Sequence, residues 1–156
     1  MLIINLSKGR LGADIANVLG GLIVGSLANA AYSRENIPES ERKPFFLYID
    51  EFHSFTTEVL ADMLSELRKY RLGMILAHQH TSQLDRSVFE AILGNVGTLM
   101  VFRVGANDAT LMAKHLAAAV PSPRDLSNLP NYEMYTRVLI NGCQSKPFSA
   151  RTLGKV

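Results

Sequence analysis

The stretch Phe45-Phe46-Leu47-Tyr48-Ile49-Asp50-Glu51 decides how the rest of this sequence is interpreted. Its first five residues form a continuous apolar run, which predicts a central strand covered on both faces. Two acids follow at the carboxyl end of that strand. In open α/β sheets ligands bind outside the carboxyl ends of the strands, and adjacent acids there are costly unless they face a cation or a reacting group. The alternative is a strand that ends in two solvated acids.

This pattern is typical of a Walker B strand. The first acid of such a strand helps to hold the water shell of Mg²⁺, and the second orients or deprotonates the water that attacks a γ-phosphate. The next predicted strand, residues 74–77, is followed by His78 and Gln79. A neutral amide at that point can sense a terminal phosphate or position water, although a polar strand end is the simpler explanation. Because neighbouring parallel strands end at one edge, we expect Asp50, Glu51 and Gln79 to lie along it.

Apolar periodicity predicts strands and helices in alternation. We expect strands at residues 2–6, 45–49, 74–77 and 98–102, and helices at residues 14–33, 57–70, 85–93 and 108–118, with Gly73 ending the second helix. Residues 34–44 are a polar connection, residues 121–130 are irregular, and Asn141-Gly142 predicts a hairpin of residues 134–140 and 144–150. Strands separated by helices imply parallel crossovers. We therefore expect one α/β domain over residues 1–156, with mostly parallel strands flanked by helices and a terminal β-hairpin.

The composition narrows the class of protein. The chain has 156 residues, of which 47% are hydrophobic, which excludes intrinsic disorder. The net charge is −2 for residues 1–102 and +4 for residues 103–156; the basic part has the charge to contact phosphates, but charge alone favours a solvated surface. Residues 15–31 carry no charge, yet their glycines and asparagines favour a helix packed inside a soluble core over a membrane span. The single cysteine, Cys143, excludes an intramolecular disulfide.

Two further features concern nucleotide chemistry. Arg68 is expected at the edge of the apolar face of the predicted helix 57–70, where a cation near the helix end suits the helix dipole or reaches a neighbouring subunit's nucleotide as an arginine finger. No segment reads G-x-x-x-x-G-K-[ST], the loop that cradles phosphates. The sequence therefore predicts catalytic side chains at the carboxyl edge of the sheet but no phosphate-binding loop (phosphate cradle). We expect the chain by itself not to hydrolyse ATP.

Taken together, these segments resemble the C-terminal half of the motor domain of TraG/TraD-like conjugative coupling proteins, the DNA-pumping ATPases of type IV secretion within the FtsK/HerA superfamily. The resemblance covers about residues 2–110. It rests on segments in matching order and spacing: residues 5–12, 47–52, 65–70, 76–79, 94–98 and 102–105. It implies a three-layer RecA-like P-loop NTPase sheet, of which this chain supplies the C-terminal half.

The resemblance also implies roles for single residues. Asp50 is similar to the Walker B acid that holds Mg²⁺ through water, Glu51 to the catalytic glutamate and Gln79 to the sensor glutamine. Arg68 falls on the family's proposed arginine finger. Arg103 is a weaker candidate for a second interfacial arginine that contacts nucleotide, with a surface arginine at a strand end as the alternative. ATP and Mg²⁺ are the implied cofactors of the intact protein.

At the level of the whole protein, the resemblance implies a homohexamer that pumps single-stranded DNA, contacts a relaxosome accessory protein, and works in the cytoplasm at the bacterial inner membrane. The chain lacks the Walker A half, the N-terminal membrane helices and the all-α domain of its relatives, so it looks like a fragment or a truncated reading frame. A non-catalytic module that binds DNA or a relaxosome protein is the main alternative, and a gene remnant without function is a third.

The histidines raise the question of a metal site. His53 stands where many relatives have another polar residue, and His78 and His80 would share one face of a continued strand. No third ligand stands at a convincing spacing in the sequence. We therefore do not expect metal binding by histidine.

Overall fold

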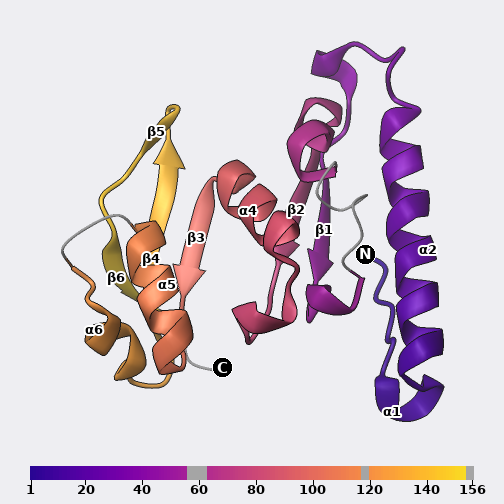
Figure 1. The fold of residues 1–156 in the computed structure, drawn as a ribbon. Coiled ribbons are helices and arrows are strands. Elements are labelled where there is room, and N and C mark those ends of the chain that lie inside the picture. The colour runs from indigo at the N-terminus through magenta and orange to yellow at the C-terminus, as the bar shows by residue number, and fades with distance from the viewer. Residues whose placement is uncertain (56–62, 117–119, 154–156) are drawn as a thin grey trace. The chain divides into compact units, whose positions relative to one another are not determined.

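The computed structural model describes residues 1–55, 63–116 and 120–153, and the chain divides into two compact units, Met1–Asn95 and Val96–Val156 (Figure 1). The first unit contains α1 (Lys8–Leu11), α2 (Ala13–Tyr32), β1 (Phe45–Ile49), β2 (Leu72–Leu76), α4 (Arg86–Asn95) and four short 3-10 helices, η1 (Glu39–Glu41), η2 (Phe52–Phe55), η3 (Leu67–Tyr70) and η4 (Thr81–Gln83). The second contains β3 (Thr98–Val101), α5 (Ala106–Leu116), α6 (Pro123–Ser127), β4 (Glu133–Ile140), β5 (Cys143–Gln144) and β6 (Phe148–Arg151).

The sheet of the first unit is a parallel pair. β1 and β2 run side by side with Phe45 opposite Leu72 and Ile49 opposite Leu76, as the strand–helix–strand order predicts. The outer side chains of β1 are not covered, because Phe46 is 61% exposed and Tyr48 is 73% exposed. The prediction of a strand buried on both faces is therefore wrong within this chain, while the prediction of a parallel strand at residues 45–49 is confirmed.

The predicted first strand is also absent. Residues 1–7 form no strand, and Leu2 and Ile3 are 83% and 77% exposed. An apolar run becomes a strand only where a neighbouring strand accepts its hydrogen bonds. Among the described residues, β1 pairs with β2 alone, and nothing pairs with residues 2–6.

The long helix α2 confirms the helix predicted at residues 14–33. Its buried side is a stripe of small residues and one valine: Ala16, Gly20, Val24, Ala28 and Ala31. Small side chains allow close approach, and α2 packs against η2 and η3, with the rings of Tyr32 and Tyr70 edge to face at 5.5 Å. By length and composition alone α2 is also apolar enough to cross a membrane, a test that core helices of soluble proteins pass as well.

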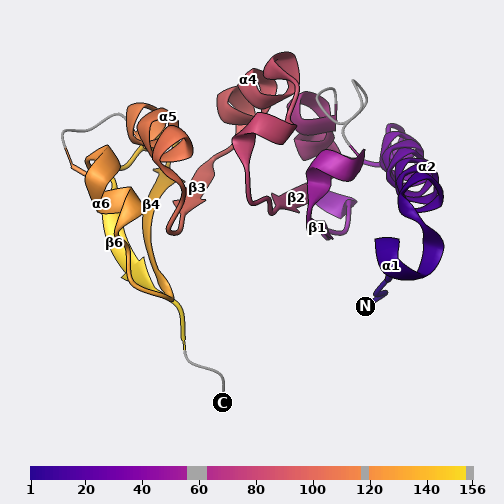
Figure 2. The ribbon, with the colours of Figure 1, turned by 60° about the horizontal axis from the view of Figure 1, so that its bottom comes forward.

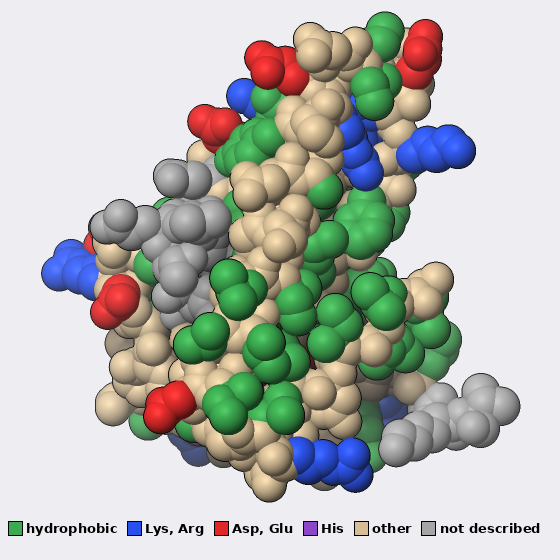
Figure 3. Space-filling view, turned by 90° about the vertical axis from the view of Figure 1, so that its right-hand side faces the viewer, with side chains coloured by type: hydrophobic (Ala, Val, Ile, Leu, Met, Phe, Trp, Pro, Cys, Tyr) green, Lys and Arg blue, Asp and Glu red, His purple; other side chains and the backbone are tan. Residues whose placement is uncertain are grey.

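The opposite side of α2 carries large apolar side chains that are exposed. Figure 3 shows apolar side chains gathered on this face of the molecule. From α2 they include Ile15, Val18, Leu19 and Leu22, with exposures from 39% to 64%. A contiguous apolar surface of this kind marks an interaction face in soluble proteins.

The second predicted helix ends differently from the prediction. Residues 56–62 lie outside the described part of the chain; residues 63–66 are helical and continue into η3. Arg71, with φ 60°, adopts the left-handed conformation that ends η3, whereas Gly73 was expected to do so. Gly73 lies instead within β2 opposite Phe46, and a Cβ there would meet the Phe46 ring at 2.8 Å.

The second unit is an antiparallel sheet with two helices that pack against each other (Figure 2). β4 pairs with β3 on one side, and with β5 and β6 on the other. Asn141 and Gly142 both have positive φ, of 51° and 81°, which confirms the predicted hairpin turn. β3 and α5 confirm the strand predicted at 98–102 and the helix predicted at 108–118 within its described residues, whereas residues 117–119 lie outside them.

One segment of this unit is more regular than predicted. Residues 123–127 form α6 inside the stretch expected to be irregular. Ser122 caps it: the hydroxyl oxygen accepts from the Asp125 N–H, and the Asp125 carboxylate accepts from the Ser122 N–H at 2.8 Å. Leu126 anchors the helix in the core at 0% exposure. A reciprocal capping box stabilises even one turn of helix.

The α/β class is thus confirmed, and its parallel pairing holds for β1 and β2. The other described strands are antiparallel, since β3 pairs with β4. The expectation of mostly parallel strands therefore fits only the first unit, because the chain after β3 passes through α5 and α6 and then runs along β3 in the opposite direction as β4.

Candidate functional site

The carboxyl end of the parallel pair brings the predicted acids and the predicted glutamine together. The pairing continues past the strands: the Ala77 N–H donates to the Ile49 carbonyl at 2.9 Å, and the Phe52 N–H donates to the Ala77 carbonyl at 3.3 Å. These two bonds hold the segment after β1 against the segment after β2. Residues 50–51 therefore lie beside residues 78–79, as the register argument predicts.

Glu51 occupies an unusual backbone conformation at this edge. Its φ is 51°, in the left-handed region, where a residue with a Cβ costs about 1–2 kcal/mol. The turn begins at Asp50, whose Oδ1 accepts from the Glu51 N–H at 3.0 Å, and it buries the next residue, Phe52, to 4% exposure. Backbone strain of this kind clusters at functional sites, which makes Glu51 the residue around which the site is built.

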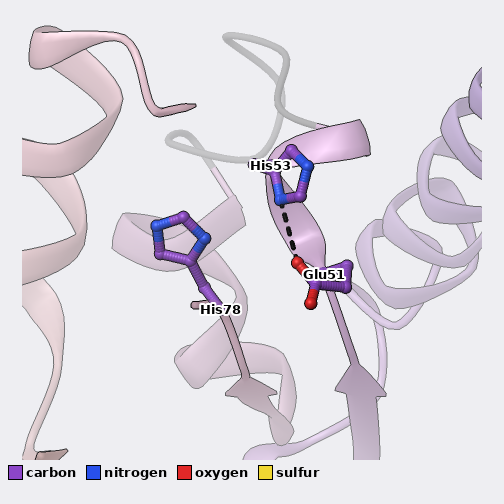
Figure 4. A group of neighbouring side chains, drawn as sticks. All are labelled: Glu51, His53 and His78. Carbon is purple, nitrogen blue, oxygen red and sulfur yellow. Dashed lines mark ion pairs between the residues drawn. The ribbon is translucent and has the colours of Figure 1, made fainter. Parts of the chain in front are cut away.

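The carboxylate of Glu51 is held from two sides. Gln79 Nε2 donates to Oε1. The Nδ1 atom of His53 lies 3.3 Å from Oε2, the ion pair that Figure 4 shows. The Glu51 side chain is 34% exposed and that of His53 is 18% exposed. The carboxylate is thus oriented by the protein and still reachable from solvent, as a group that handles a water molecule requires.

His78 completes this cluster. It follows β2, and its ring lies 5.6 Å from the His53 ring and 5.1 Å from the Phe52 ring, centroid to centroid. Sequence reasoning did not connect His53 and His78 to Glu51. The signal was present, since both lie within two residues of a predicted site residue, but the left-handed turn that brings His53 back to Glu51 is not visible in the sequence.

Asp50 is exposed and directly follows β1, at the same edge. A carboxylate oxygen is the ligand that Mg²⁺ prefers, usually with several waters retained. Asp50 has the donor chemistry for a water-mediated Mg²⁺ contact, and only one of its oxygens has a hydrogen bond to the Glu51 backbone. The residues at this edge therefore fit part of a Mg²⁺ site.

Arg68 lies at the other end of the parallel pair. It is exposed on η3, which precedes β2, and the Arg71 carbonyl in the same turn accepts from the Phe45 N–H at the start of β1. Because a strand rises about 3.3 Å per residue, the five-residue strands place Arg68 roughly 16 Å or more from the edge that carries Glu51. The structure does not bring Arg68 to the acids of its own chain.

Arg103 lies in the second unit, just after β3. Its guanidinium donates to the Leu129 carbonyl at 3.3 Å and to Asn131 Oδ1 at 2.9 Å. These bonds tie the end of β3 to the loop before β4. This structural role accords with the alternative of a strand-end arginine.

A family model matches the part of the chain that contains these residues. Residues 44–119 match the family model described as the TraM recognition site of TraD and TraG, a span that runs from β1 through α5. No curated protein matches the sequence significantly.

Solved structures share the fold. The plasmid coupling protein TrwB in complex with the GTP analogue GDPNP is 23% identical, with a TM-score of 0.70 over 88% of this chain and 38% of TrwB. The genome packaging NTPase B204 of Sulfolobus turreted icosahedral virus 2 is 14% identical, with a TM-score of 0.60 over 85% of this chain and 62% of B204. VirB4 of Thermoanaerobacter pseudethanolicus is 15% identical, with a TM-score of 0.60 over 85% of this chain and 36% of VirB4.

The chain spans little more than a third of the length of the TrwB chains that it matches. At these identities the structural likeness establishes only that the chain shares its α/β fold with these proteins, and the family model adds a match to one specific region. Residues 44–119 are therefore similar to this region of TraD and TraG, as the motifs predict.

Proposed function

We propose that this chain is the C-terminal half of the motor of a coupling protein that moves DNA during conjugative transfer through a type IV secretion system, driven by ATP hydrolysis. The observation that carries the proposal is the oriented Glu51 carboxylate at the end of a parallel strand pair, held by Gln79, inside the region that matches TraD and TraG. An acid and an amide so placed suit the activation of water beside a terminal phosphate.

The uncovered surface of the first unit supports this assignment. Parallel strands are ordinarily covered on both faces, and here Phe46 and Tyr48 are open to solvent beside an α2 that exposes Val18 and Leu22. In the intact motor, strands and helices from the half that carries the phosphate loop would cover these faces and complete one mostly parallel, three-layer sheet with residues 2–6 as a strand. This completed sheet forms the single domain that we expect.

In this proposal each site residue has a distinct role. Glu51 orients and deprotonates the attacking water, Gln79 senses the terminal phosphate, and Asp50 holds Mg²⁺ through a water ligand. Mg²⁺ bound to the nucleotide phosphates neutralises charge that develops during transfer. Arg68 lies away from the acids of its own chain and therefore acts as an arginine finger on the nucleotide of a neighbouring subunit, with Arg103 as a second interfacial arginine.

The partners follow from the same proposal. The intact protein is a homohexamer on the cytoplasmic side of the bacterial inner membrane and handles single-stranded DNA. Residues 44–119 supply the contact to a relaxosome accessory protein, which the name of the matching family model supports.

The test is the frequency of DNA transfer from donor cells that carry the coding region in its natural genetic context. Glu51→Gln keeps the shape of the side chain and removes the base, so transfer should fall at least about 100-fold, the lower range for loss of a general base. Glu90→Gln is the matched control, because Glu90 is an exposed acid paired with Arg86 on α4. Transfer that is unchanged by Glu51→Gln, or equally reduced by Glu90→Gln, contradicts the proposal.

The purified chain provides a second test. Without a phosphate cradle in its sequence, it should release no phosphate from ATP above the rate in buffer. Steady phosphate release that is lost in Glu51→Gln would show that this half is catalytic by itself.

A non-catalytic binding module is the second candidate, favoured by the net charge of +4 in residues 103–156. A DNA contact of this type depends steeply on salt, because binding releases counterions. Binding of single-stranded DNA to the purified chain at about 50 mM salt, lost as the salt rises, supports the module. The absence of binding at low salt excludes the DNA contact.

A further inference from the structure

The fold gathers three potential metal ligands that the sequence keeps apart. Glu51 and His53 come from the segment after β1, and His78 comes from the segment after β2 (Figure 4). One ligand atom from each residue lies within 4.8 Å of the other two. Sequence spacing offered no third ligand for the histidines, and the tertiary structure supplies Glu51.

We propose that Glu51, His53 and His78 form a binding site for a divalent transition-metal ion, Zn²⁺ in particular. Two imidazoles and one carboxylate suit Zn²⁺ and differ from the all-oxygen sets that Mg²⁺ prefers. Three protein ligands of this type leave the fourth position of a tetrahedral zinc open to water.

The distances favour a tetrahedral ion. Zinc–nitrogen and zinc–oxygen bonds of about 2.0–2.2 Å place two tetrahedral ligands about 3.4 Å apart. The Nδ1 atom of His53 and Oε2 of Glu51 are 3.3 Å apart, so this pair already has the required separation. His78 closes the remaining gap by rotating its side chain, since its ligand atom is at most 4.8 Å from the other two.

The surroundings hold the ligands in place and keep them accessible. The backbone bond from the Phe52 N–H to the Ala77 carbonyl fixes the two segments that carry the ligands, and the Phe52 ring packs against the His78 ring. Gln79 donates to the other oxygen of Glu51, a contact of the type that orients a metal-bound carboxylate. Solvent reaches the Glu51 side chain, which provides both an entry route and the fourth ligand.

The consequence for activity rests on the proposed function. A zinc ion at this position coordinates the Glu51 carboxylate, which is proposed to activate water, and so prevents it from acting as a base. Bound zinc therefore inhibits ATP hydrolysis in the intact motor, and the site is a metal-dependent brake on the motor rather than part of its chemistry.

The test is isothermal titration calorimetry of the purified full chain with Zn²⁺ in the absence of nucleotide, which measures the affinity and the number of ions bound. We expect one high-affinity ion per chain. His53→Gln and His78→Gln should each lower the affinity for Zn²⁺ by at least about 10-fold. Loss of a residue that only supports a metal ligand already lowers metal affinity by about 10-fold or more. His80→Gln is the matched control, an exposed histidine two residues from His78, and Cys143→Ser controls for the exposed thiol; both should leave affinity unchanged.

Two further measurements keep the result decisive. Zn²⁺ should raise the thermal midpoint of the wild-type chain but not that of the histidine variants, and Co²⁺ should give a visible absorption band that the same variants lose. If a histidine variant fails to fold, Glu51→Gln, which changes one atom of the side chain, takes its place. No binding, or binding that survives all three substitutions, overturns the site. Because no nucleotide or DNA transfer is involved, this outcome is independent of the transfer assay.

Discussion

The two units of this chain differ in the type of sheet that carries their exposed apolar side chains. The first, Met1–Asn95, contains a parallel pair of strands with exposed aromatic side chains and a 20-residue helix whose large apolar side chains face solvent. The second, Val96–Val156, is an antiparallel sheet of four strands with two helices. It also exposes Met100 and Ile140, but antiparallel sheets commonly have one solvated face.

Parallel sheets are ordinarily covered on both faces, whereas antiparallel sheets commonly have one solvated face, so the exposed apolar surface is unusual only for the sheet of the first unit. β1 and β2 form a parallel pair with an open face, whereas β4 in the second unit has antiparallel partners on both sides. The candidate site lies at the carboxyl end of the parallel pair, in the unit whose exposed surface is unusual for its type of sheet.

Substitution of one fully buried leucine in each unit tests whether the two cores are separate, and it has the largest expected effect. Leu67 in the first unit and Leu126 in the second are both 0% exposed. Leu67→Ala and Leu126→Ala should each cost about 2–5 kcal/mol of unfolding free energy, since each leaves a cavity. Native-state hydrogen exchange should show the loss of protection only in the substituted unit.

The matched control for this pair is Leu153→Ala, because Leu153 is 96% exposed. It should change stability by less than about 0.5 kcal/mol. Equal loss of protection in both units after either core substitution would show a single cooperative core and would remove the contrast drawn above.

The two faces of α2 provide the next test. Ala28→Leu forces a large side chain into the buried stripe, where Ala28 is 2% exposed, and should cost about 1–3 kcal/mol. Val18→Lys and Leu22→Lys lie on the exposed face and should change stability by about 0.5 kcal/mol or less. They should reduce self-association in light scattering, because they interrupt the apolar surface.

A strong destabilisation by Val18→Lys or Leu22→Lys would mean that the chain itself covers this face. Such a result would argue against a missing half of the motor as the partner of α2. Self-association that persists in both variants would show that another surface of the chain mediates it.

The smallest effect concerns pH and is confined to the second unit. Burial, followed by the positive charges of Lys114 and Arg137, lowers the pKa of His115 below its ordinary value of 6.5. The folded chain therefore binds this proton less tightly than the unfolded chain. The stability that His115 contributes is complete above about pH 6.5 and is lost as the pH falls through the lower folded pKa.

Chemical denaturation at several pH values checks this prediction. The wild-type chain should lose slightly more stability than His115→Gln between pH 7 and pH 5, the range over which histidine titrates. Identical pH profiles for the two proteins would show that His115 does not contribute to the pH dependence.

Local sequence patterns were sufficient for most elements. Alternation and apolar periodicity correctly predicted β1, α2, β2, α4, β3, α5 and the hairpin at Asn141-Gly142, because each of these rests on side chains close in sequence. Two predictions failed although the deciding residues are close in sequence: the capping box of Ser122 and Asp125 begins α6, and Arg71 ends η3. The other failures arose where a distant partner decides the outcome. Residues 2–6 lack a strand beside them, and β3 pairs with a strand more than thirty residues later rather than with β2.

The site shows the same division. The sequence alone placed Asp50, Glu51 and Gln79 at one edge, since a parallel register follows from strand order, and its motifs predicted the TraG/TraD-like family. Only the tertiary structure decided that Glu51 turns left-handed and that ligand atoms of His53 and His78 lie within 4.8 Å of its carboxylate. It also decided that Arg68 lies at the far end of the strands. The order of strands and helices along the chain follows from local sequence patterns. The direction of one strained turn instead depends on the packing of Phe52 and on hydrogen bonds from the neighbouring strand.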